Sequence, residues 1–219
     1  FNCIVAAFFV CLVSATTINA QKVRSTPKPT AVATKPKLLP TDKMAVPAKA
    51  VEFYDQGKAF WKEIEINKAI EAFTRAIEID PSYTDALAER GSIYFLIRKF
   101  SLAIADLDKV LAAQSKNAKC LYYRGSAFTE LAIAKREDDD DQRSAADLAQ
   151  RALADLNKAI EISPREYLYY NGRGQLLLEF EYFKEARADL EKSLSIEPNF
   201  VAHTYLGLAK HYLEDETAM

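Results

Sequence analysis

A few residues of this chain are of types that catalyse reactions or bind metals. His203 and His211 are the two histidines, and neither has a carboxylate or cysteine partner at the spacing of a metal site. Cys120 has no histidine in its own segment to activate it, which favours packing as a small apolar side chain over nucleophilic catalysis. Gly172 and Gly174 lie in a helical pattern with no preceding strand, so they do not form a nucleotide-binding loop. We therefore expect no enzyme activity, no metal and no cofactor.

The acidic run Glu137–Asp141 is the remaining candidate for ion binding. It could hold a divalent cation or a basic partner, but it lacks the alternating ligands and the glycine of a calcium loop. The run favours a solvated turn whose last aspartates stabilise the start of the next helix.

Charge is distributed unevenly along the 219 residues. Residues 21–49 carry seven basic and one acidic side chain (+6), whereas residues 50–219 carry 22 basic and 30 acidic side chains (-8). A folded part of charge -8 repels phosphate backbones, which excludes general nucleic-acid binding. Three cysteines, at positions 3, 11 and 120, are too few for a disulfide framework.

The first 20 residues resemble a secretory signal peptide. An apolar run from Ile4 to Val13 is followed by small and hydroxylated residues that end at Ala20, before Gln21. The run is shorter than the roughly 20 apolar residues that span a bilayer. We expect cleavage and export to a periplasm or the extracellular side. The alternative is an uncleaved segment that anchors the protein in a membrane, and a membrane contact is expected only in that case.

Residues 21–49 are predicted to be a disordered, basic, Pro-rich linker. They contain five of the eight prolines, seven Lys or Arg residues and no aromatic residue. Such a segment cannot bury enough apolar surface to offset the entropy lost on ordering.

From residue 50 onward the sequence repeats with a period of 34. Gly57, Gly91 and Gly125 are 34 residues apart, and Gly174 follows 49 residues later, which equals one period plus 15. One 15-residue insertion in the third unit explains this departure. Each unit contains two segments with helical spacing of apolar residues, such as 50–63 and 67–80. A single helical hairpin cannot bury its apolar face, so the hairpins must stack into an all-α solenoid.

A 34-residue unit with Gly in the eighth place, an aromatic in the eleventh, Ala in the twentieth and Pro near the end resembles the tetratricopeptide repeat (TPR) family. The resemblance covers residues 50–213. It divides them into units 50–83, 84–117, 118–166 with the insertion, and 167–200, followed by a capping helix 201–213 and a tail 214–219. The fold that this resemblance implies is a right-handed superhelix of helical hairpins.

The resemblance also implies that the first helices line a concave groove that binds a peptide or helix of another protein. The side chains placed in this groove are Tyr54, Asp55, Lys58, Trp61, Ala88, Glu89, Ser92, Phe95, Tyr122, Tyr123, Ser126, Asn171 and Gln175. The alternative for Trp61, Tyr122 and Tyr123 is helix packing. The clamp that some members use for the C-terminal carboxylate of chaperones is absent, because its places hold Tyr54, Lys58 and Glu89.

Paired charges recur inside the units. An arginine stands immediately before the repeat glycine, and an aspartate stands before the core leucine of the second helix, in units two, three and four alone. The residues are Arg90 and Asp106, Arg124 and Asp155, and Arg173 and Asp189. Because the two residue types appear and vanish together, we predict a structural ion pair in each of these units.

These patterns predict an exported scaffold that binds another protein, whose identity the sequence does not reveal. The alternative is a membrane-anchored structural or assembly subunit that forms a homo-oligomer through its groove or its terminal helix.

Overall fold

The computed structural model of the chain describes residues 46–136 and 142–218. The chain divides into two units, residues 1–45 and residues 46–219, and the description concerns the second. The predictions for residues 1–20, for residues 21–45 and for the acidic run 137–141 lie outside the described residues.

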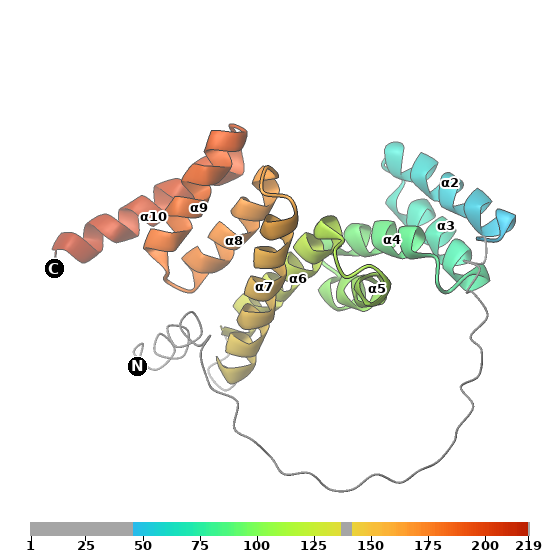
Figure 1. Cartoon of the computed structure of the whole chain (residues 1–219), viewed down its shortest axis with the longest axis horizontal. Coiled ribbons are helices and arrows are strands. Elements are labelled where there is room, and N and C mark those ends of the chain that lie inside the picture. The colour runs from blue at the N-terminus through green and yellow to red at the C-terminus, as the bar shows by residue number, and fades with distance from the viewer. Residues whose placement is uncertain (1–45, 137–141, 219) are drawn as a thin grey trace, which may run out of the picture. The chain divides into compact units, whose positions relative to one another are not determined.

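The described residues form helices and connecting turns, without strands (Figure 1). The helices are α2 (Ala48–Lys62), α3 (Ile66–Ile79), α4 (Thr84–Leu96), α5 (Phe100–Ala113), α6 (Ala118–Arg136), α7 (Gln142–Ile162), α8 (Tyr167–Glu179), α9 (Phe183–Ile196) and α10 (Phe200–Ala218).

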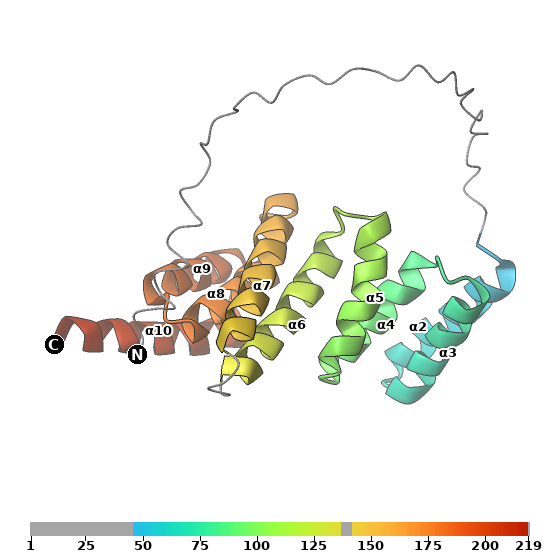
Figure 2. The same ribbon diagram turned by 90° about the horizontal axis from the view of Figure 1, so that it is seen from below.

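Consecutive helices pair into hairpins that stack side by side, as the two views in Figures 1 and 2 show. The pairs are α2 with α3, α4 with α5, α6 with α7 and α8 with α9, and α10 packs on α9 and α8. The first helices also touch one another, because α4 contacts α6 and α6 contacts α8. The fold class predicted from the 34-residue period, an all-α solenoid of helical hairpins, is confirmed.

Two predicted boundaries differ from the structure. Helix α2 begins at Ala48, inside the range assigned to the linker, because the carbonyl of the N-cap residue Pro47 accepts the first intrahelical hydrogen bond, from the Val51 N–H at 3.2 Å. Helix α10 continues to Ala218 instead of ending at residue 213. Residues 214–218 contain neither Gly nor Pro, the residues that most disfavour a helix, so the helix continues through them.

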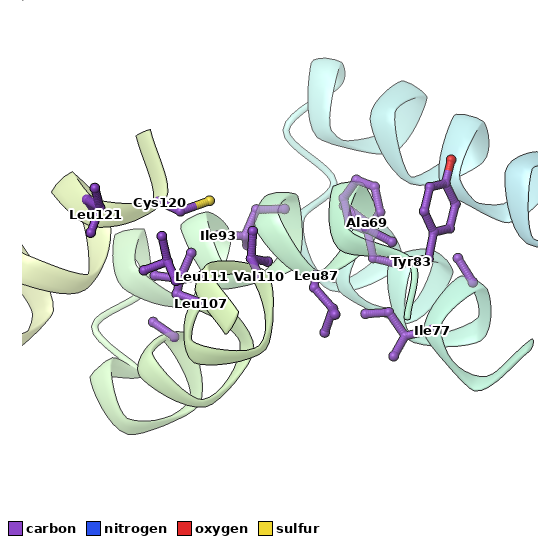
Figure 3. Packing of buried hydrophobic residues seen from close by; sticks show 14 of the residues in the cluster. Ala69, Ile77, Tyr83, Leu87, Ile93, Leu107, Val110, Leu111, Cys120 and Leu121 are labelled. Atoms are coloured by element: carbon purple, nitrogen blue, oxygen red, sulfur yellow. The ribbon is translucent and has the colours of Figure 1, made fainter. Parts of the chain in front are cut away.

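The repeat glycines allow the two helices of each hairpin to approach closely. A Cβ atom on Gly57 would lie 2.7 Å from the ring of Phe73, and one on Gly174 would lie 2.9 Å from Cγ of Leu190. Phe73 and Leu190 are almost fully buried. Figure 3 shows the core that results between α3 and α6, where Leu87, Leu107 and other apolar side chains pack together.

Each predicted arginine–aspartate pair is present as a double hydrogen bond. Nε and Nη2 of Arg90 donate to the two carboxylate oxygens of Asp106 at 2.7 and 2.8 Å. Arg124 binds Asp155 in the same way, and Arg173 binds Asp189. The three aspartates are 4%, 7% and 7% exposed.

The structure adds a contact that the sequence analysis did not predict. The third guanidinium nitrogen, Nη1, donates to the second helix of the preceding hairpin. The acceptors are Thr74 Oγ1 for Arg90 at 2.9 Å, Asp108 Oδ1 for Arg124 at 2.6 Å and Asn157 Oδ1 for Arg173 at 2.7 Å. Each arginine therefore joins two neighbouring hairpins.

The insertion lengthens both helices of the third hairpin. Helix α6 has 19 residues and α7 has 21, against 13 to 15 in the other paired helices. Arg136, at the end of α6, donates to the backbone carbonyl of Glu179 and lies over the ring of Phe180. The longer α6 therefore supports the turn between α8 and α9.

Three hairpin turns each contain one residue with a strained backbone conformation. Helices α2, α4 and α8 end in a Schellman motif, in which the residue after the C-cap adopts the left-handed conformation that favours glycine. These residues are Ile64, Arg98 and Glu181, with φ of 62°, 59° and 67°. In the first turn, Ile64 N–H donates to the Trp61 carbonyl and Glu65 N–H to the Phe60 carbonyl.

We expect Ile64→Gly to stabilise the protein. Ile64 is 77% exposed, so little packing is lost, and glycine removes the strain of a β-branched residue at positive φ. The free energy of unfolding should rise by about 0.5–1 kcal/mol after the entropy cost of glycine is subtracted. Denaturant unfolding measures this. The control is Ile79→Gly at the end of α3, which should destabilise. A loss of stability in Ile64→Gly would contradict the strain.

We expect Asp189→Ala to lower the free energy of unfolding by about 3–5 kcal/mol, because the partly buried Arg173 loses its carboxylate. Arg173→Met combined with Asp189→Leu should recover much of this loss, because no charge is then left unpaired. The control is Arg187→Met, which removes an exposed pair with Glu191 and should change stability by less than about 1 kcal/mol. Equal effects of Asp189→Ala and Arg187→Met in thermal or denaturant melts would contradict the structural role.

Candidate surface for binding a partner

The residues predicted to line the groove lie on the first helices, α2, α4, α6 and α8, but they differ in exposure. Asp55 and Lys58 are exposed, whereas Ser92, Ser126 and Asn171 are buried. The half-buried members are Tyr54, Trp61, Ala88, Glu89, Phe95, Tyr122, Tyr123 and Gln175. The three buried residues therefore pack between helices and do not face solvent.

Aromatic rings on the first helices contact one another across neighbouring hairpins. Tyr54 lies 5.2 Å from Tyr83, measured between ring centroids. In a second group, Phe95 is 5.6 Å from Tyr123, Tyr123 is 5.2 Å from Tyr122, and Tyr122 is 5.3 Å from Tyr169. We call these six residues (Tyr54, Tyr83, Phe95, Tyr122, Tyr123 and Tyr169) the aromatic strip.

The sequence analysis missed two members of the strip. Tyr83 immediately precedes α4, and Tyr169 is the third residue of α8. Neither lies at a position that the family geometry assigns to the groove. The sequence does contain a signal for them, because both tyrosines stand at the start of a first helix. There Tyr83 contacts Tyr54 and Tyr169 contacts Tyr122, each on the first helix of the preceding hairpin. Trp61 packs against the core and has no ring contact with the strip among the described residues.

Ion pairs flank the strip. Lys58 Nζ is 2.9 Å from Asp55 Oδ1 and lies 4.6 Å from the centroid of the Tyr54 ring. Lys119 Nζ is 3.2 Å from Glu89 Oε1 and thereby connects α6 to α4. Both lysines remain about half exposed, so each ammonium keeps donors for a ligand.

The phenol groups of the strip stay protonated at neutral pH. Burial raises the pKa of Tyr122 to about 12. Burial and then the charge of Glu89 raise the pKa of Tyr54, and burial also raises the pKa of Tyr123. Within residues 46–136 and 143–214, the structure shows no hydrogen bond from the hydroxyls of Tyr54, Tyr83, Tyr123 or Tyr169. Tyr54 and Tyr123 are half-buried, so their hydroxyls remain available to a ligand, whereas Tyr83 and Tyr169 are buried, each with 8% exposure.

Polar groups farther along the first helices are already engaged. Glu130 accepts from Arg98 at 3.0 Å and from the Gln175 amide at 3.2 Å. Asn171 donates to Asn199 at 2.9 Å, and Asn199 caps α10 by accepting from the Ala202 N–H. These side chains hold neighbouring hairpins together.

The residues first considered for catalysis lie elsewhere. His203 and His211 are exposed on α10, and Cys120 is 2% exposed beside Leu121 (Figure 3). Burial raises the pKa of the Cys120 thiol to about 11, so little of the reactive thiolate forms at neutral pH. Among the described residues, no group of three or more His, Cys, Asp or Glu side chains has the arrangement of a metal site. No helix in the same ranges is long and apolar enough to cross a membrane.

Known proteins resemble both the sequence and the fold. The family model of the tetratricopeptide repeat matches residues 53–83 and 167–200. The human mitochondrial import receptor subunit TOM70 is 28% identical over 153 residues, which cover 66% of this chain and 22% of that protein. Mouse RNA polymerase II-associated protein 3 is 27% identical over 119 residues, covering 54% of this chain and 16% of the relative. The chain thus spans about a fifth of the length of these relatives.

Two solved structures share the fold. TTC0263, a thermophilic TPR protein of Thermus thermophilus, superposes with a TM-score of 0.63 at 17% identity and covers 75% of this chain and 82% of its own. The MamA protein superposes with a TM-score of 0.62 at 24% identity, covering 78% and 86%. The 34-residue period, the stacked hairpins and the family match at the first and fourth units agree, and the chain is a tetratricopeptide repeat protein.

Proposed function

We propose that this protein is an exported scaffold that binds a peptide or helix of a partner protein on its first helices. The observation that carries the proposal is the aromatic strip, whose rings bridge neighbouring hairpins while the hydroxyls of the half-buried Tyr54 and Tyr123 have no partner within the described part of the chain. Tyrosine supplies a large contact area and a polar tip at a low entropy cost, so partly exposed tyrosines favour protein binding.

The relatives support protein binding as the general activity. One is named an import receptor subunit and another an RNA polymerase II-associated protein, and both names describe work with other macromolecules. Because the chain spans only about a fifth of their length, these relatives support protein binding in general and do not indicate which partner this chain binds. Export rests on the apolar run and small residues within positions 1–20.

A second candidate is a subunit that self-associates through α10. The outer face of this helix carries the exposed apolar residues Phe200 (84%), Val201, Leu208 and Tyr212. Gly207 on the same helix has no neighbouring atom within 4 Å of the place of a Cβ. In the earlier hairpins the corresponding face is covered by the second helix. In this candidate, residues 1–20 would anchor the subunit in a membrane.

The two candidates are distinguished by affinity capture from an exported fraction with the chain and two matched variants. Phe95→Ala with Tyr123→Ala removes a ring pair of the strip, and Phe183→Ala with Tyr212→Ala removes a stacked pair at α10, 4.8 Å apart. We expect the first variant alone to lose the captured protein. Circular dichroism should show both variants to be helical.

Retention of the same protein by the Phe95 and Tyr123 variant would contradict binding on the strip. If light scattering instead shows an oligomer that the Phe183 and Tyr212 variant dissociates, the assembly role is correct.

A further inference from the structure

We propose that the ligand of the aromatic strip is a proline-rich, basic segment of a partner protein, bound in an extended polyproline II conformation. This inference rests on the proposed function, because it names the chemical class of the segment that the first helices bind. Three properties of the strip lead to it: the ring surfaces, the unused hydrogen-bonding groups and the charge.

The half-buried rings of Tyr54, Phe95, Tyr122 and Tyr123 offer a surface for flat apolar groups, whereas Tyr83 and Tyr169 are buried. Phe95, Tyr123, Tyr122 and Tyr169 form an unbroken series of ring contacts from α4 across α6 to α8. Tyr54 and Tyr83 form a separate ring pair, and the ion pair of Glu89 on α4 with Lys119 on α6 lies beside the strip. Aromatic-lined surfaces of this kind bind polyproline II segments, which lose little entropy on binding because proline restricts the backbone in advance.

The unused hydrogen-bonding groups suit a backbone that accepts but does not donate. An ordinary extended peptide needs acceptors for its N–H groups, and the acceptors on this surface are largely engaged: Asp55 by Lys58, Glu89 by Lys119, and Glu130 by Arg98 and Gln175. The open groups are the hydroxyls of Tyr54 and Tyr123, the lysine N–H donors and the Asp85 carboxylate, so donors predominate. Proline has a carbonyl but no N–H, so a proline-rich segment would satisfy these donors and leave few N–H groups of its own unpaired.

The charge favours basic residues in the ligand. Residues 50–219 carry 22 basic and 30 acidic side chains. Near Tyr54 and Tyr83, the carboxylates of Asp55, Asp85 and Glu89 outnumber the ammonium groups of Lys58 and Lys119. Asp85 is exposed and has no ion pair among the described residues, so a lysine or arginine of the ligand can pair with it.

The test is a titration of two labelled synthetic peptides with the full chain, in which fluorescence anisotropy of the label measures binding. One peptide repeats Pro-Pro-Lys, and the other has every proline replaced by alanine at the same charge. We expect the proline peptide to bind at least about tenfold more tightly, since the alanine peptide must be ordered on binding and has unpaired N–H groups. An amphipathic helical peptide of equal charge is the third probe.

A matched set of variants locates the site. Tyr54→Phe combined with Tyr123→Phe keeps both rings in place and removes two hydroxyls, so the affinity for the proline peptide should fall about three- to tenfold. Tyr212→Phe removes a hydroxyl from α10, outside the strip, and should leave the affinity unchanged. Because these substitutions preserve ring packing, the variants are expected to fold.

Each other outcome overturns the inference. Equal affinity for the proline and alanine peptides would show charge attraction alone, and preference for the helical peptide would show a different ligand class. Absence of binding to all three peptides would also overturn it. In these cases the proposed function stands if protein capture still depends on Phe95 and Tyr123, and it fails only if that dependence is missing.

Discussion

The close approach of two helices at the repeat glycine is the constraint on which the rest of this structure depends. Gly57 and Gly174 each face a large buried side chain at a distance that no Cβ atom would tolerate. This contact sets the separation of the helices in a hairpin. That separation in turn brings the arginine before the glycine opposite the aspartate of the second helix, because both residues neighbour the contact in sequence. The glycine spacing therefore determines the geometry of the ion pairs as well as the apolar core.

Each arginine then connects this local geometry to the preceding hairpin. Two of its nitrogens bind the aspartate of its own unit, and the third binds a side chain of the preceding unit. Because the guanidinium is planar and its donors are fixed, the two sets of bonds restrict the angle between hairpins. The first unit has Gln56 and Ala72 at these positions and has no preceding repeat among the described residues. The extra contact occurs where a described neighbour is present to accept it.

The fold was largely predictable from the sequence, whereas the binding surface was predictable only in part. The period of 34, marked by Gly57, Gly91 and Gly125, predicts the hairpins, since each glycine marks a helix contact. The family geometry assigns positions on a helix, but exposure depends on the neighbouring side chains. Asn171 occupies a groove position yet is buried, because Asn199 at the start of α10 contacts it. No repeat pattern indicates this contact, which joins residues from α8 and from the turn before α10.

The way in which this protein uses its polar groups separates stability from recognition. The arginines, Glu130, the Gln175 amide and the Asn171 Nδ2 group are engaged between hairpins, so they hold the stack together and offer little to a ligand. Within the described ranges, the half-buried Tyr54 and Tyr123 show no hydrogen bond from their hydroxyls, while their rings pack against other rings of the strip. Rings that already pack against one another lose little side-chain entropy when a ligand binds, and preorganisation of this kind increases affinity without additional contact area.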